Sequence, residues 1–214
     1  MLEVPLLLLL GLSGMFLVGG MAASAAFAET RFDDLEACWE SYAASRRLGF
    51  ERSTGRWPNW KSPVAQGRIK DVEVAVDAFR RGAKDDPRAC TRVIGRALSP
   101  VEARIAASSS HLLAPGPELA ILPRARTHDS TFDAAFALRA SDAEQVAVVL
   151  SSEVRGAMFS FLAATLGEGT LLEYEDGEVT LLWLGAETSP IVLDRAVEVV
   201  VAVCRTMPLK RGYR

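Results

Sequence analysis

The stretch LLEYEDGEVTLLWL, residues 171–184, decides the fold that we expect for this chain. At its centre, Asp176-Gly177 favours a two-residue turn, and the flanking residues are rich in Leu, Val, Tyr and Trp, which are frequent in strands. The stretch therefore predicts an antiparallel hairpin. A two-residue turn also fixes the register, because it sets Tyr174 opposite Val179 and Leu172 opposite Leu181.

Helical patterns lie on both sides of this hairpin. Ser141 with Glu144 three residues later is a capping box that predicts a helix over residues 142–150, and a second helix follows over about 152–165. A last helix is predicted from Pro190 to about Met207, with these residues inward: Ile191, Val192, Ala196, Val199, Val200 and Val203. Two segments ahead of the helices are predicted as strands, Leu119–Leu122 and Phe132–Arg139.

The N-terminal half begins with an amphipathic helix and continues with strands. The helix is indicated by apolar residues three and four positions apart, namely Phe32, Leu35, Trp39 and Tyr42. Alternating apolar and polar residues predict a hairpin from residues 64–69 and 72–79, and another strand over 91–98. The charged stretch Arg80–Arg88 contains Gly and Pro and is expected to be an exposed loop.

These elements indicate an α+β fold with antiparallel hairpins and C-terminal helices. The expected order is a transmembrane anchor or signal peptide (4–28), a membrane-proximal amphipathic helix (29–48), a β-rich part (49–98), a connecting loop (99–119), an α+β part (120–207) and a basic tail (208–214). Whether the two parts share one sheet is left open at this point.

The apolar segment Val4–Ala28 has two interpretations. It contains no charged residue and is long enough to cross a bilayer, and the basic residues that follow it favour a cytoplasmic C-terminal side. This interpretation places a single-pass protein in the inner (cytoplasmic) membrane, with its N-terminus outside. The alternative is a signal peptide cut after Ala28, which would release a periplasmic or secreted domain, but Met1-Leu2-Glu3 lacks the basic residues that such peptides begin with.

Composition excludes several classes of protein. The net charge of −3 lacks the basic excess of a nucleic-acid-binding protein, so no nucleic-acid partner is expected. Cys38, Cys90 and Cys204 are far apart and odd in number, which indicates neither a disulfide framework nor a zinc site. GxSxG, Walker and GxGxxG motifs are absent.

The residues of the C-terminal part also carry a family resemblance. The runs THDSTFDAAFALRASDAEQVAVVLSSEVRGAMFSFL and EYEDGEVTLLWL resemble a family of bacterial membrane-associated domains of unknown function. The matching positions are Phe132, Phe136, Asp142, Leu150, Ser151, Glu153 and Arg155. The runs LEACWESYAASRRLGFERSTGRW and GRIKDVEVAVDAF are similar to the membrane-proximal helix and first strands of related proteins. The resemblance implies an anchored α+β domain and transfers no catalytic residue.

A few polar residues are candidates for a functional site. His128 beside Asp129 could act as a base or ligand, although a solvated loop histidine is the commoner outcome. Glu175 opposite Glu178 could form an acidic pair, and the sequence pair Asp85-Asp86 is also acidic. Basic residues that could touch anionic lipid are Arg80, Arg81, Lys84 and Arg88. None of these patterns assigns a catalytic residue, cofactor or metal ligand.

The function predicted from the sequence is a non-catalytic interaction or scaffold domain that a membrane anchor holds at the cytoplasmic face, with a protein partner. One alternative is an exported domain that binds a small molecule between its two parts. Another is an enzyme of unfamiliar design that uses Glu153 and Arg155, or His128.

Overall fold

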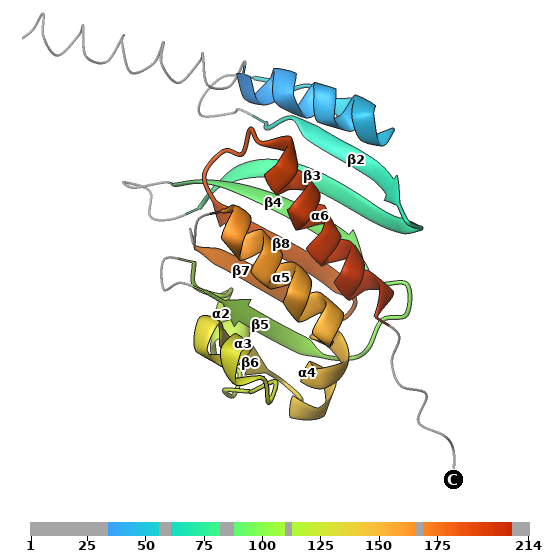
Figure 1. Cartoon of the computed structure of the whole chain (residues 1–214). Helices are drawn as coiled ribbons and strands as arrows, with labels where there is room; N and C mark the ends of the chain where they lie inside the picture. The colour runs from blue at the N-terminus through green and yellow to red at the C-terminus, as the bar shows by residue number, and fades with distance from the viewer. Residues whose placement is uncertain (1–33, 56–60, 82–87, 110–112, 166–168, 207–214) are drawn as a thin grey trace, which may run out of the picture.

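One antiparallel sheet of eight strands forms the centre of the molecule (Figure 1). The computed structural model describes residues 34–55, 61–81, 88–109, 113–165 and 169–206. The strands are β1 (Gly49–Glu51), β2 (Val64–Ile69), β3 (Val72–Arg81), β4 (Arg88–Arg96), β5 (Arg104–Ser108), β6 (Ala137–Ala140), β7 (Thr170–Glu175) and β8 (Glu178–Leu184). Their order across the sheet is β1-β2-β3-β4-β8-β7-β5-β6. The α+β class with antiparallel hairpins is therefore confirmed.

Two tight turns set the register of the sheet. In the β7–β8 hairpin Tyr174 pairs with Val179 and Leu172 with Leu181, as the Asp176-Gly177 turn predicts. The β2–β3 hairpin turns at Lys70 and Asp71, whose φ angles of 48° and 70° are typical of a type I′ turn. Both hairpins expected from the sequence are present.

Strand β4 joins the two halves of the chain, because it pairs with β3 on one side and with β8 on the other. The two parts of the domain therefore share one sheet. Residues 99–119, expected to be a connecting loop, instead contain β5, which lies between β6 and β7. The sequence Arg104–Ser108 is RIAAS, four of whose five residues are buried, so it lacks the alternation that marks a half-exposed strand.

Helices cover one face of the sheet (Figure 1). Residues 34–46 form the first described helix, and the others are α2 (Pro117–Ala120), α3 (Ser130–Ala135), α4 (Ala143–Val149), α5 (Ser152–Ala164) and α6 (Pro190–Arg205). The helix of residues 34–46, α5 and α6 pack side by side on this face. The main core lies beneath them and includes Trp39, Phe161 and Trp183.

A smaller apolar cluster lies on the opposite face. Leu113, Leu119 and Leu122 pack there against Leu171 and Leu182, which point away from the main core. This cluster follows from the alternation of side chains along β7 and β8, since Leu172 and Leu181 belong to the main core.

Two segments predicted as strands are different in the structure. The predicted strand Leu119–Leu122 is occupied by the end of the short helix α2 and the residues after it. The predicted strand 132–139 is divided between α3 and β6. Asp129 explains the second error, because its carboxylate accepts hydrogen bonds from the N–H groups of Thr131 and Phe132 and so starts a helix where strand residues are abundant.

Three smaller details also differ from expectation. The N-cap of α4 is Asp142, whereas the hydroxyl of Ser141 accepts a hydrogen bond from the N–H of Arg104. Ile191, expected inward on α6, is 70% exposed. The expected loop Arg80–Arg88 is shorter, because β3 continues to Arg81 and β4 begins at Arg88.

No helix within the described residues is by itself long and apolar enough to cross a bilayer; α4 and α5 reach that length only as a pair, bent by 70°. The segment 4–28, with its alternatives of anchor and signal peptide, and the basic tail 208–214 lie outside the described residues.

Candidate functional site

A groove runs along the outer edge of β6, with a volume of about 810 Å³. It forms because residues 123–126 follow this edge as an irregular extra strand. The N–H of Ala125 donates to the carbonyl of Leu138 at 3.0 Å, and the N–H of Ala140 donates to the carbonyl of Pro123 at 3.1 Å. Arg124 and Arg139 therefore lie side by side as an isolated bridge.

Aromatic residues form the base of the groove next to α3. The rings of Phe132 and Phe136 stack with centroids 4.6 Å apart, and Phe159 of α5 meets both rings edge-on. Phe136 is 2% exposed and lines the groove together with Leu138. The base formed by Phe136 and Leu138 is therefore apolar, and the rings of Phe132 and Phe159 pack behind Phe136.

Positive charge dominates the rim of the groove. Arg124, Arg126 and His128 are exposed, and Arg139 is half-buried. One carboxylate, that of Asp133, also lines it, and its Oδ1 accepts hydrogen bonds from the N–H and hydroxyl of Thr127, both at 2.9 Å. Arg139 donates to the carbonyl of Leu122 at 2.7 Å. Within the described part of the chain, none of the three guanidinium groups takes part in an ion pair, so each keeps donors for an anion.

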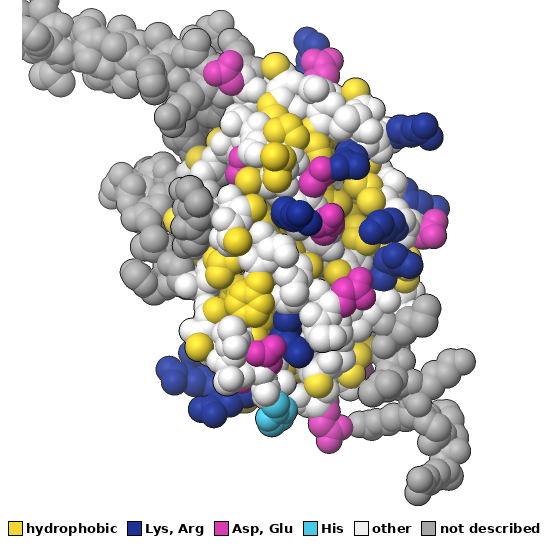
Figure 2. All heavy atoms as spheres, viewed as in Figure 1, with side chains coloured by type: hydrophobic (Ala, Val, Ile, Leu, Met, Phe, Trp, Pro, Cys, Tyr) yellow, Lys and Arg dark blue, Asp and Glu magenta, His cyan; other side chains and the backbone are white. Residues whose placement is uncertain are grey.

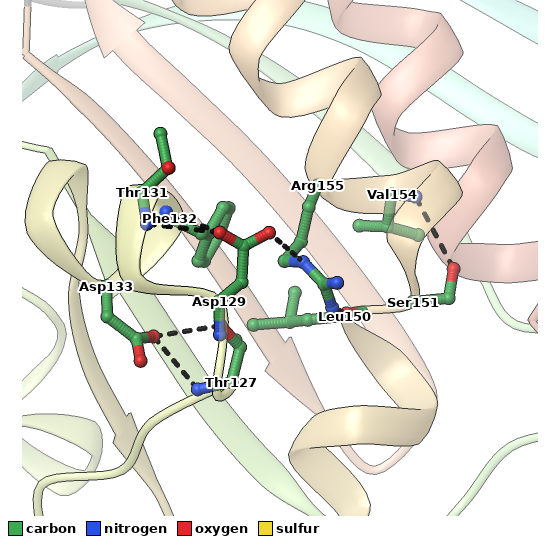
Figure 3. Close-up of polar contacts among 9 residues, drawn as sticks. All are labelled: Thr127, Asp129, Thr131, Phe132, Asp133, Leu150, Ser151, Val154 and Arg155. Atoms are coloured by element: carbon green, nitrogen blue, oxygen red, sulfur yellow. Dashed lines mark hydrogen bonds and ion pairs between the residues drawn. The ribbon is translucent and has the colours of Figure 1, made fainter.

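A second polar cluster fixes the wall of the groove (Figure 3). Arg155 of α5 donates from Nε to Oδ2 of Asp129 at 3.1 Å and from Nη1 to the carbonyl of Leu150 at 2.7 Å. The other oxygen of Asp129 accepts the N–H groups of Thr131 and Phe132. The hydrogen bond from Phe132, supported by Arg155, lowers the pKa of Asp129. This cluster joins the start of α3 to the start of α5.

The same contacts decide the role of the His128-Asp129 pair. The hydrogen bonds of the Asp129 carboxylate go to helix α3 and to Arg155, so both of its oxygens are already engaged (Figure 3). His128 has a φ of 64° and is exposed at the groove rim. The geometry gives Asp129 a structural role and leaves His128 as a contact residue.

The other residues weighed from the sequence lie apart from the groove or inside the fold. Glu153 is exposed on α5 and lines a separate recess with Lys70 and Arg205. Glu175 and Glu178 are cross-strand partners at the hairpin end, and both are exposed. The remaining positions of the resemblance are structural: Phe132, Phe136 and Leu150 are buried, while Asp142 and Ser151 cap α4 and α5.

Some weighed residues fall outside what the structure describes. These are Lys84, Asp85 and Asp86, while Arg80, Arg81 and Arg88 are placed only by backbone register. No group of three or more His, Cys, Asp or Glu side chains in the described ranges is arranged to hold a metal ion.

The sequence did not reveal the groove. Arg124 and Arg126 belong to the run PRARTHD, residues 123–129, which reads as an ordinary polar loop. Arg139 is 13 positions beyond Arg126, and only the bridge between residues 124 and 139 brings the charges together. The alternation of Arg124 and Arg126 with smaller residues was the available signal, because it matches an extended segment at a sheet edge.

Comparison with known proteins gives a likeness of fold. No protein-family model matches the chain, and no curated protein matches it. The crystal structure of the mycobacterial trehalose monomycolate transport factor A, TtfA, is similar with a TM-score of 0.55 and 10% sequence identity. The similarity covers 81% of this chain and 96% of that chain. At this identity the likeness concerns the α+β fold alone.

Proposed function

We propose that this chain is a single-pass membrane-anchored interaction domain at the cytoplasmic face of the membrane, with residues 4–28 as its anchor. The observation that carries the proposal is that the helix of residues 34–46, which follows the apolar segment, is built into the core. Leu35, Trp39, Tyr42 and Ala43 are each at most 3% exposed. Arg46 at the end of this helix pairs with Asp194 of α6.

Only a few residues separate the apolar segment 4–28 from the helix of residues 34–46. Residues 29–33 separate the apolar segment from the first described residue, and five residues span at most about 18 Å. An anchor at 4–28 would therefore hold the sheet next to the bilayer, because the helix of residues 34–46 that follows it packs into the core of the domain. The family resemblance to membrane-associated domains supports the same assignment.

The groove at β6 favours recognition over catalysis. Three guanidinium side chains outnumber its one carboxylate above an apolar base, and this combination suits binding of an anionic or amphipathic partner. Asp129, which lies next to the groove histidine, is already bound by α3 and Arg155. The domain is accordingly proposed to act through a partner.

A narrower candidate comes from the fold. TtfA is described as a trehalose monomycolate transport factor, and its fold covers most of this chain. We propose on this ground that the domain assists a membrane transport process as an accessory factor. A deletion strain that exports its envelope lipids at the normal rate would contradict this narrower candidate and leave the anchored interaction domain standing.

The first experiment is a topology and cleavage test. A reporter fused to the C-terminus and active on only one side of the membrane is combined with the intact mass of the recovered chain. Full-length protein with an inside reporter supports the proposal. A chain that starts at Glu29 outside the cytoplasm would instead support the exported, ligand-binding alternative.

The second experiment addresses the partner. In-cell crosslinking of the full chain should yield a reproducible adduct in the membrane fraction. The matched control is a chain with Trp39→Ala, which removes a core side chain of the membrane-proximal helix. An adduct pattern that varies between preparations, or that is unchanged in the control, would argue against a specific protein partner.

A further inference from the structure

One end of the sheet carries both the start of the first helix and the basic groove. Helix 34–46 begins there, since the carboxylate of Glu36 accepts the N–H of Ser53, just beyond the end of β1. The antiparallel register sets the end of β8, Leu184, and the start of β7, Thr170, at this end. It also places Ala137, the first residue of β6, beside Ser108 at this end.

Part of the lining of the groove lies at this same end. Residues 123–126 run antiparallel to β6, and the pairs 123 with 140, 124 with 139 and 125 with 138 bring Arg126 next to Ala137. In Figure 2, one cluster of Lys and Arg side chains lies near α3, on the side from which the first helix starts in Figure 1, and further basic side chains are spread over the opposite side. Backbone register adds Arg81 opposite Arg88 at the same end.

The two features lie at opposite edges of the sheet. The first helix leads into β1 at one edge, and the groove follows β6 at the other. Seven strand spacings of about 4.8 Å separate these edges by roughly 34 Å. A domain held only at the β1 edge is free to tilt, whereas a second contact at the β6 edge would fix its orientation.

We propose that the groove lined by Arg124, Arg126, His128 and Arg139 docks onto anionic phospholipid headgroups and is the second attachment of the domain to the membrane. Guanidinium groups bind phosphate by paired hydrogen bonds, and the three in the groove outnumber its single carboxylate, Asp133. The net charge of the whole chain is −3, so the charge of this cationic groove is opposite in sign to the net charge of the chain. The inference deepens the proposed function and rests on its membrane attachment.

The test uses the full chain in lipid nanodiscs made of phosphatidylcholine, with or without phosphatidylglycerol. Ala134→Cys, labelled with a polarity-sensitive fluorophore, reports on the groove, because Ala134 is exposed and lines it. Leu98→Cys is the matched probe, since Leu98 is 52% exposed and follows the opposite end of β4. The unsubstituted chain measures labelling of the native cysteines.

In discs with phosphatidylglycerol, the emission of the fluorophore at position 134 is expected to shift to the blue and to be quenched by quenchers attached to the lipid. The fluorophore at position 98 is expected to show neither change. Arg124→Ala with Arg126→Ala should lower the ratio of docked to undocked chain roughly 30-fold, because two basic residues near an anionic surface are removed. Arg96→Ala with Arg205→Ala removes the same charge from exposed residues outside the groove and should leave the shift in place. Melting temperatures of both double variants check that each is folded.

Three outcomes would overturn the inference. One is an unchanged probe at position 134 in phosphatidylglycerol discs, and another is an equal effect of both double variants. A shift produced only by added membrane proteins would assign the groove to an acidic protein segment instead. A chain that fails to co-elute with the discs refutes the proposed anchor, and titration of the same probe with phosphatidylglycerol vesicles then still decides whether the groove binds lipid.

Discussion

The indole N–H of Trp39 donates a hydrogen bond to the backbone carbonyl of Glu187 at 2.8 Å, across 148 positions of the chain. The carboxylate of Glu187 in turn accepts the indole of Trp183 at 3.3 Å and the N–H of Ser189 at 2.7 Å. One short loop between β8 and α6 thus binds the first helix, a central strand and the start of the last helix. The helix of residues 34–46 is therefore fixed to the sheet by polar contacts as well as by packing.

Replacing Trp39 by Phe should lower the free energy of unfolding by about 1–3 kcal/mol. The substitution leaves the carbonyl of Glu187 without its indole donor and removes part of a fully buried ring. Glu187→Gln is the milder comparison, since its one side-chain oxygen can still accept from either Ser189 or Trp183, and the Trp39 bond goes to the backbone carbonyl and stays intact. Urea unfolding with equal midpoints for the two variants would contradict this account.

Gly95→Ala should destabilise the domain by about 1–3 kcal/mol, because α6 crosses β4 at this glycine. A methyl group there would lie 2.9 Å from the sulfur of Cys204 and closer still to Val200. Val200→Ala in the same chain should recover part of the loss by making room. Gly156→Ala is the matched control: its methyl group would have no neighbour within 4 Å, and Ala in a helix interior is favoured by up to about 1 kcal/mol. Thermal unfolding of the three variants and the wild type measures the difference.

Asp129 should contribute to stability against acid. Its pKa is lowered in the folded chain by the hydrogen bond from Phe132 and by Arg155, so its contribution is present above the unfolded pKa of about 3.9 and is lost as pH falls through the lower folded value. Asp129→Asn keeps the helix cap but loses the ion pair, whereas Asp129→Ala loses both. At neutral pH the melting temperature should be highest for the wild type, lower for Asp129→Asn and lowest for Asp129→Ala. In both variants the loss of stability below about pH 4 should be smaller than in the wild type. An identical acid profile for wild type and Asp129→Asn would be inconsistent with this role.

Stability should also fall in alkali. Burial raises the pKa of the Cys204 thiol to about 12, against about 8.5 for an unfolded cysteine. The thiol therefore favours the folded state below the unfolded pKa, and this contribution disappears as pH rises through the folded value. Cys204→Ala should reduce the slope of unfolding free energy against pH above about pH 9. Some slope should remain, because burial also raises the pKa of Tyr42 and Tyr174.

The parts of the fold that sequence predicted correctly are those set by local rules. The Asp176-Gly177 turn determines which residues of β7 and β8 face each other, so the register follows from the turn alone. β5 was missed because Arg104–Ser108 is short and almost fully buried, and its partners β6 and β7 come much later in the chain. Phe132 and Phe136 were assigned to a strand because their four-residue spacing fits either structure, and the cap at Asp129 decided the helix.

The candidate site was harder to predict than the fold. Arg155 was noted from the family resemblance, and Asp129 as a neighbour of His128, but the contact between them spans 26 positions and joins two helices. The groove depends on pairing at the edge of β6, which no local pattern specifies. Charge at residues 124 and 126 was visible in the sequence, but its concentration in one place is a tertiary effect.

The pairing of β4 with β8 also constrains how the protein is made. The ribosome completes β4 at Arg96, but the partner strand starts only at Glu178, and α6, which covers both strands, ends at Arg205. Until then, the nascent chain holds a four-stranded meander, β1 to β4, whose β4 edge lacks its neighbour. A translation product that stops before Glu178 would present this unpaired edge to other chains, and exposed strand edges favour aggregation. Folding of the N-terminal strands is thus completed only after β8 and α6 have been translated.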